Sequence, residues 1–499
     1  MEAGWEGEMA RSRIDLRNMM ARAAIVGKRR SQDDELFAEE LLFDHEELEH
    51  IKRARNTGPR PGGTNATGRK NYAESTWARM LRDQSAQLKS HTSPESKVFR
   101  NRFRVPFAIF ERLALWAKGW HEKGKADASG RRRIPTELKV LGVLRILGRA
   151  TCFDGIEELS SISVPTMQGF FHQFTSKVRS ELYDLHVHMP KTKEEMSEAE
   201  APYAVLGFPG AFFSMDVVHV AWCMCPEYLN HLTKGKEGFP TIAYNVCSDH
   251  QGRALSVCPG AYGATNDKTI VKFDTAIDEV RTRSFFTEYE YEVRTGPGDE
   301  DRKMESGAWG IVDGGYLKWA VTQAADKVCS LPGYARWRMQ MESVRKDIEC
   351  FFGRLKARFR ILKTPLSFHD KKQIDDLFFT CVTLQNLLLD WDVGSGRVVG
   401  WEVDPGWGLF EDDESGASDA RLWSRPKLRR FGKFNEFFTP EPTADFSEFG
   451  RSCMPAHTAR LLTKTPPVPG EAQRYEKKQS ALVEHFTHAV SAGAVHWLR

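Results

Sequence analysis

The chain has 499 residues, of which 41% are hydrophobic and 28% are charged, and its formal net charge is +3 at pH 7. This length predicts about two to four domains with sizeable cores, and the longest apolar runs fall well short of the roughly 20 residues that a membrane span needs. Nine cysteines occur without a CxxC pair, and the first residues lack the basic and then apolar order of a signal peptide, so we expect a reduced protein of the cytoplasm or nucleus.

Residues 1–90 are polar and segregated by charge. An acidic helical stretch at 33–50 is followed by a basic stretch at 51–55 and then by the breaker-rich NTGPRPGGTNATGRK. Such a composition favours a flexible charged arm over a packed domain.

Residues 91–195 are predicted to be helical. Leucines recur every third position within 135–147, and the next long helix begins at SVPTMQGFFHQFTSKV, where Ser163 can cap the helix and Pro165 suits its first turn. With the short segment 154–160 between them, these helices predict a helix-turn-helix-like DNA-binding region. A helical bundle that only packs against its neighbours fits the same spacing.

From residue 205 the hydrophobic period changes to that of strands. AFFSMDVVHVAW, GFPTIAYNVCSD and GRALSVCPGAYG predict an antiparallel meander. A helix near Asn266, a polar stretch at 278–307 that we expect to be a loop or small insertion, a strand at 309–313 and an amphipathic helix at 336–359 follow. This order predicts an RNase H-like core over residues 205–392, a mixed sheet with flanking helices in the α+β or α/β class.

Three acidic residues carry the chemistry that this core would perform. Asp216 lies within a strand-like run, Asp313 ends another, and Glu349 lies on the amphipathic helix. Hard cations such as Mg²⁺ prefer oxygen ligands. Two such ions about 3.5–4 Å apart stabilise the attacking and leaving oxygens of a displacement at phosphorus. The pattern therefore predicts a metal-dependent site that cuts and joins phosphodiesters.

Other acidic and histidine residues near these positions have competing interpretations. Asp267, at a helix start, could join the metal site or could cap the helix. His219 is three positions after Asp216 on a strand, so its side chain points to the other face. Asp347 is roughly 200° around the helix from Glu349, so the two cannot face one metal pair.

Basic residues on the 336–359 helix are the predicted contacts to DNA phosphates. They are Arg345, Arg354 and Lys356, and helical periodicity places Arg345 and Lys356 on the side of Glu349. Short basic clusters at 28–30 and 131–133 suit phosphate contact or nuclear import, although such clusters are also typical of a solvated surface.

Residues 393–499 form a polar extension. Its predicted terminal helix, at about 475–490, is expected to fold back onto the catalytic core.

The blocks SMDVVHVAW, YGATNDKTIVKFD, VDGGYLKW and ESVRKDIECFFGRLKARFRIL together resemble the PIF/Harbinger superfamily of DDE transposases, especially its plant-transposon-protein branch. The resemblance spans about residues 75–392. It implies Asp216, Asp313 and Glu349 as catalytic and metal-binding residues, and 35 residues separate the last two.

The same resemblance implies Mg²⁺ or Mn²⁺ as cofactor, with two ions expected from the chemistry above, nuclear location, terminal-inverted-repeat DNA as substrate and often a separate Myb-like partner protein. Whether the active form is a homodimer is left open by the sequence. The function that it implies is DNA cleavage and strand transfer. The alternative is a domesticated DNA-binding or adaptor protein that keeps the fold without cutting.

Overall fold

The structure is a computed structural model that describes residues 72–90, 92–121, 134–298, 300–325, 333–394 and 470–495. The contacts divide the chain after Lys70, and all described residues belong to the unit that begins at Asn71. Most of the predicted arm, both short basic clusters and residues 395–469 lie outside the described part. The described end of that arm, residues 72–89, is helical and not a flexible segment, because Trp77 and Leu88 are buried in the core.

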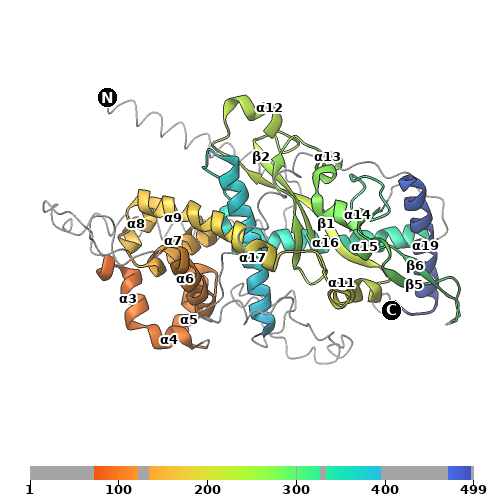
Figure 1. Ribbon diagram of the computed structural model, residues 1–499, viewed down its shortest axis with the longest axis horizontal. Coiled ribbons are helices and arrows are strands. Elements are labelled where there is room, and N and C mark those ends of the chain that lie inside the picture. The colour runs from red at the N-terminus through yellow and green to blue at the C-terminus, as the bar shows by residue number, and fades with distance from the viewer. Residues whose placement is uncertain are drawn as a thin grey trace. The chain divides into compact units, whose positions relative to one another are not determined.

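A mixed sheet forms the centre of this unit (Figure 1). Its strands are β1 (Ala211–Ala221), β2 (Thr241–Ser248), β3 (Ala254–Val257), β4 (Ala261–Tyr262), β7 (Trp309–Val312) and β8 (Thr322–Ala324). The antiparallel meander is confirmed, because β2 pairs antiparallel with β1, β3 and β4. β7 then pairs parallel with β1, and β8 parallel with β7. The resulting order is β3-β2-β1-β7-β8, and β8 was not predicted.

Two long helices cover the sheet. α16 (Tyr334–Arg358) packs against β1, and its predicted apolar stripe is buried: Met341, Val344, Ile348, Phe351 and Leu355. α17 (Lys371–Gly394) lies between the sheet and the amino-terminal helices (Figure 1). Tyr244 of β2 stacks on Phe378 of α17 at 3.9 Å between ring centroids. The sheet and the helical region therefore share one hydrophobic core.

The helical region is confirmed over most of its predicted length. Its elements are α5 (Pro94–Phe103), α6 (Phe107–His121), α7 (Thr136–Arg149), α8 (Phe153–Ser160), α9 (Val164–Lys177), the π-helical η2 (Val178–Leu182), α10 (Tyr183–His186) and α11 (Lys193–Val205). Ser163 has the extended backbone of an N-cap, but its hydroxyl lies 2.9 Å from that of Thr166. The carboxylate of Glu157 accepts from the backbone N–H of Val164 instead, at 3.3 Å.

The stretch 278–307, expected to be a loop or small insertion, is folded. It holds the end of α14 (Thr275–Thr282), then α15 (Ser284–Thr287) and a hairpin of β5 (Glu290–Arg294) and β6 (Arg302–Ser306). Alternation along β5 puts Tyr291 and Val293 on one buried face. That face is covered by the terminal helix α19 (Glu471–Ser491), which folds back onto the core as predicted (Figure 1).

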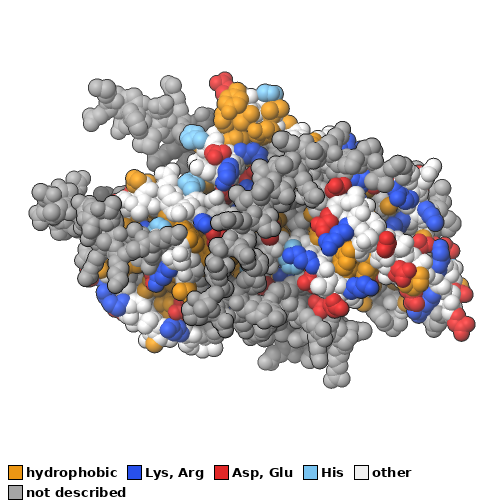
Figure 2. Space-filling model, viewed as in Figure 1, with side chains coloured by type: hydrophobic (Ala, Val, Ile, Leu, Met, Phe, Trp, Pro, Cys, Tyr) orange, Lys and Arg blue, Asp and Glu red, His pale blue; other side chains and the backbone are white. Residues whose placement is uncertain are grey.

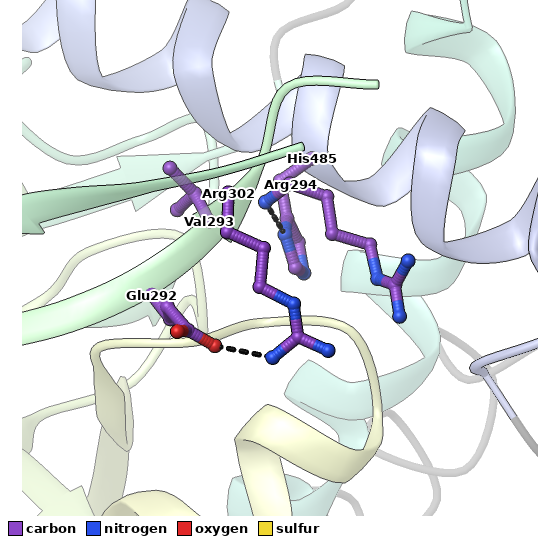
Figure 3. Close-up of a pocket in the computed structure, with 5 residues that line it drawn as sticks. All are labelled: Glu292, Val293, Arg294, Arg302 and His485. Carbon is purple, nitrogen blue, oxygen red and sulfur yellow. Dashed lines mark hydrogen bonds and ion pairs between the residues drawn. The ribbon is translucent and has the colours of Figure 1, made fainter. Parts of the chain in front are cut away.

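A pocket of about 170 Å³ lies where this hairpin meets α19. Arg302 donates to Glu292 at 2.6 Å, and the backbone N–H of Arg294 donates to Nδ1 of His485 at 2.7 Å. Both hydrogen bonds are drawn in Figure 3. Burial, with the charge of Arg294, lowers the pKa of His485 to about 4. His485 is therefore neutral and accepts a backbone hydrogen bond that joins α19 to the hairpin, which is a structural role. None of the residues that line this pocket is among the acidic residues of the candidate active site.

The other described elements are short: η1 (Tyr72–Glu74), α3 (Thr76–Asp83), α4 (Ser85–Lys89), η3 (Glu227–Leu229), α12 (Asn230–Thr233), α13 (Asp267–Ile270), η4 (Val271–Phe273) and η5 (Arg360–Leu362). Among the helices that the structure describes, none combines the length and apolar character needed to cross a membrane.

Candidate active site

Asp216 lies in the middle of β1, the strand at the centre of the sheet, and its side chain is 23% exposed. Its Oδ1 accepts from the backbone N–H of Val217 at 2.8 Å. Burial raises the pKa of Asp216 to about 6, against the opposing effects of the Val217 N–H and Arg345. The negative charges of Asp313 and Asp267 raise this pKa further.

Asp313 follows β7 directly, and the parallel pairing of β7 with β1 brings it to the side of Asp216. Its Oδ1 accepts from the backbone N–H of Gly315 at 2.6 Å. A Cβ on Gly315 would lie 2.8 Å from Asp313 Oδ1 and 3.5 Å from Asp267 Oδ2. The two carboxylates therefore border the same turn, and only a glycine leaves them this space.

Asp267 is the first residue of α13, but it does not cap that helix. Asn266 does so, since its side chain accepts from the N–H of Thr269 at 2.9 Å. Burial raises the pKa of Asp267, and the charge of Lys236 opposes this effect. This position fits the interpretation of Asp267 as a member of an acidic cluster better than its interpretation as a helix cap. We call Asp216, Asp267, Asp313 and Glu349 the acidic cluster.

Glu349 is joined to the cluster through Arg345. The guanidinium contacts Asp216 Oδ2 through Nη1 at 3.1 Å and Glu349 Oε1 through Nη2 at 3.1 Å. Its Nε contacts Glu342 Oε2 at 3.2 Å. One side chain of α16 thus links two carboxylates of its own helix, Glu342 and Glu349, to the carboxylate of Asp216 on the strand.

The chemical type of the side chains in the acidic cluster suits a hard divalent cation. Asp216, Asp313, Asp267 and Glu349 offer only carboxylate oxygens, which Mg²⁺ and Mn²⁺ prefer. Burial is the main cause of the raised pKa of Asp216, and the charges of Asp313 and Asp267 add to it; a bound cation would offset both effects by stabilising the carboxylate form. Within the described residues, however, no three Asp, Glu, His or Cys side chains are gathered closely enough to hold a metal ion. The guanidinium of Arg345 stands between two of the carboxylates that would have to converge.

The three predicted phosphate contacts face other protein groups in this conformation. Besides the ion pairs of Arg345, Nζ of Lys356 donates to the carbonyl oxygen of His219 at 3.0 Å, and burial lowers the pKa of Lys356. The guanidinium of Arg354 lies against Gly252 in the β2–β3 turn, and burial lowers its pKa to about 10. Their role toward DNA stays a prediction.

The two residues that sequence reasoning set aside have partners of their own. Asp347 pairs with Nδ1 of His250, and Nδ1 of His219 lies 3.0 Å from the hydroxyl of Thr241. Burial lowers the pKa of His219.

The segment 223–237 borders the acidic cluster and was not predicted from the sequence as part of the site; we call it the rim. Lys236 is exposed there, and its charge acts on Asp267. Figure 2 shows hydrophobic side chains gathered over α12 in this segment, and its exposed apolar residues are Met224, Tyr228 and Leu232. The carbonyl of Leu232 accepts from the N–H of Ala264, which ties the rim to the loop that leads into α13. No periodic signal marks this segment, because it lies between two strands.

Comparison with known proteins adds two similarities. Residues 190–394 match the family described as plant transposon protein, and this range contains all four carboxylates of the cluster. The chain is also similar to Protein ALP1-like of Arabidopsis thaliana, with 21% identity over 309 residues that cover 60% of this chain and 72% of that protein. No solved structure matches the chain.

Proposed function

We propose, on the premise that this chain belongs to a PIF/Harbinger-type transposase family, that it is a metal-dependent DNA transposase. It would cleave DNA at terminal inverted repeats and transfer the freed 3′ ends into target DNA. The observation that carries the proposal is that acids remote in sequence are linked to one another in the fold. Asp216 and Asp313 act on each other from neighbouring parallel strands, and Arg345 joins Asp216 to Glu349.

The sheet supports an RNase H-like interpretation of the core. Three antiparallel strands, then β7 parallel to β1, follow the predicted succession of strands, and β8 adds one strand beyond it. Its carboxylates stand on the central strand, at the end of the neighbouring strand and on the helix that packs across β1.

The residues would divide the work as follows. Asp216 and Asp313 would hold divalent cations, Glu349 would join them once Arg345 moves, and Asp267 would be an additional ligand. Two bound Mg²⁺ or Mn²⁺ ions would supply Lewis-acid stabilisation and a water of lowered pKa. The protein's own contribution is to fix the carboxylates on rigid strands and a helix, and to keep Asp216 only partly exposed to water.

DNA would be held by the helical region and by the rim beside the site. α9 follows α7 and α8 in the manner of a recognition helix, and its outward face presents Gln168 and Gln173. Glutamine can read adenine in a major groove, and Lys236 on the rim can contact phosphate. The substrate would be double-stranded DNA in the nucleus, bound by a homodimer or together with a Myb-like partner.

A second candidate is a domesticated DNA-binding or adaptor protein that does not cut. It is favoured by the absence of a metal-holding group among the described residues and by the guanidinium between Asp216 and Glu349.

Cleavage of labelled terminal-repeat DNA in Mn²⁺ separates the two candidates. We expect the wild type to cut. Asp216→Asn, Asp313→Asn and Glu349→Gln should each lose roughly 10²–10³-fold in rate, the range for removing one group that stabilises transition-state charge. Asp347→Asn is the matched control on the same helix and should still cut. Cleavage that survives all three changes contradicts the assignment, and a wild type that binds this DNA without cutting it supports the adaptor.

A further inference from the structure

We infer that Arg345 is an internal cation that occupies the carboxylate site before a divalent metal binds and that the metal displaces it. The inference deepens the proposed function and rests on it. Arg345 thereby becomes a positioning residue that controls metal loading, in addition to its predicted contact with DNA phosphate.

The contacts of Arg345 show why it can stand in for a metal. Its side chain is 15% exposed and reaches Asp216, Glu349 and Glu342 with three different nitrogens, at 3.1, 3.1 and 3.2 Å. A guanidinium is always charged in a protein and binds carboxylates through a rigid planar fork. It therefore cannot leave the site by losing a proton, and it must move.

The charge balance of the site favours a stronger cation. Three carboxylates contact the guanidinium, and two further acids, Asp313 and Asp267, act on Asp216. Arg345 contributes one positive charge to this group, whereas each Mg²⁺ or Mn²⁺ ion contributes two. The oxygens that it engages, Oδ2 of Asp216 and Oε1 of Glu349, are among those that a metal would need.

Glu342 supplies a place to which the displaced guanidinium can move. It precedes Arg345 by three residues on α16, so both lie on one face of the helix, and it is 39% exposed. Arg345 can keep this ion pair while it gives up the other two. The exchange then costs two partly exposed ion pairs, which are individually weak.

Mn²⁺ binding to the full-length protein, measured by electron paramagnetic resonance of the free ion, tests the inference without any need for activity. Arg345→Gln should bind Mn²⁺ roughly tenfold more tightly than the wild type, the change expected for releasing two such ion pairs. Without metal its melting temperature should fall, and Mn²⁺ should raise that temperature by more than it does in the wild type. Arg345→Lys should fall in between, because an ammonium cannot fork across two carboxylates, and it carries the test if Arg345→Gln does not fold.

Arg281→Gln is the matched control. Arg281 also bridges two carboxylates, Asp278 at 3.4 Å and Glu471 at 2.7 Å, but none of these groups belongs to the acidic cluster. Its loss should lower the melting temperature and leave Mn²⁺ affinity unchanged.

The outcomes separate the inference from the function on which it rests. Mn²⁺ bound by the wild type with equal or greater affinity than by both Arg345 variants overturns the inference and leaves the metal-dependent nuclease in place. An equal gain in Arg281→Gln overturns it as well, since the effect would then be one of general charge. If no variant binds Mn²⁺, the proposed function fails and the inference fails with it.

Discussion

Asp216→Asn should stabilise the metal-free protein at neutral pH and have little effect in acid. Burial raises the pKa of Asp216 from 3.8 to about 6 in the folded protein. A proton therefore binds this carboxyl more tightly in the folded state than in the unfolded one. The stability that this proton contributes is fully present below about pH 3.8 and is lost as the pH rises through about 6.

The magnitude follows from the ratio of the two proton affinities. A difference of about two orders of magnitude corresponds to roughly 3 kcal/mol, at about 1.4 kcal/mol for each tenfold change. The side chain is 23% exposed, so solvent screening removes only part of this energy. Asparagine has nearly the same shape and carries no charge, so at pH 8 the variant should be more stable than the wild type by up to about 3 kcal/mol.

Urea unfolding in the presence of EDTA at pH 4, 6 and 8 measures the difference. The gap between Asp216→Asn and the wild type should open between pH 4 and 6 and stay constant above. Asp83→Asn, at a carboxylate that is 57% exposed on α3, is the control and should show no such gap. An Asp216→Asn protein that is less stable than the wild type at pH 8 would refute the reasoning, because the ion pair with Arg345 would then outweigh the burial of the charge.

Three further changes test the turn, the rim and the terminal helix. Gly315→Ala places a Cβ 2.8 Å from Asp313 Oδ1 and should reduce cleavage with little change in melting temperature. Gly314→Ala is the control, because its Cβ would meet nothing within 4 Å, and it should leave cleavage unchanged. Equal effects of the two variants on cleavage would contradict a close contact between residue 315 and the Asp313 carboxylate. Lys236→Gln should lower the salt dependence of DNA binding by about one phosphate contact in fluorescence anisotropy titrations, whereas Lys303→Gln, exposed on β6, should leave the slope unchanged. Phe486→Ala should destabilise the protein by about 3–5 kcal/mol, because Phe486 is fully buried and stacks on Phe208 at 5.7 Å; a melting temperature equal to that of the wild type would show that α19 is not part of the core.

Elements with a strong hydrophobic period could be predicted from the sequence. The stripe from Met341 to Leu355 predicted the buried face of α16, the apolar run around Asp216 predicted β1, and the run GFPTIAYNVCSD predicted β2. The hairpin β5–β6 was missed because its charged residues hide the alternation of Tyr291 and Val293, and because its cover, α19, lies far along the chain. β8 was missed because three residues carry no detectable period.

In the candidate site, contacts within one helix could be predicted from the sequence, whereas contacts between elements far apart in the chain could not. Helical spacing places Arg345 beside Glu349, and the structure confirms that neighbourhood with an ion pair. Spacing on one helix cannot reveal a partner on a strand, so the contact of Arg345 with Asp216 appears only in the folded protein. The capping role of Asn266 is a similar case, since a one-residue difference at the start of α13 decides whether Asp267 faces the helix or the acidic cluster.

The central claim is that Asp216 and Asp313 bind a divalent metal between them, and iron-directed cleavage of the polypeptide tests it most directly. When hydrogen peroxide and ascorbate are added, Fe²⁺ bound in place of Mg²⁺ reduces the peroxide to hydroxide and a hydroxyl radical, and ascorbate returns the resulting Fe³⁺ to Fe²⁺. The radicals cut the backbone beside the ion, and mass spectrometry locates the cuts. We predict fragments that end within β1 near Asp216 and just after β7 near Asp313, suppressed by excess Mg²⁺ and absent from Asp216→Asn. Cuts confined to other parts of the chain, or cuts at these positions that persist in Asp216→Asn, would contradict the claim.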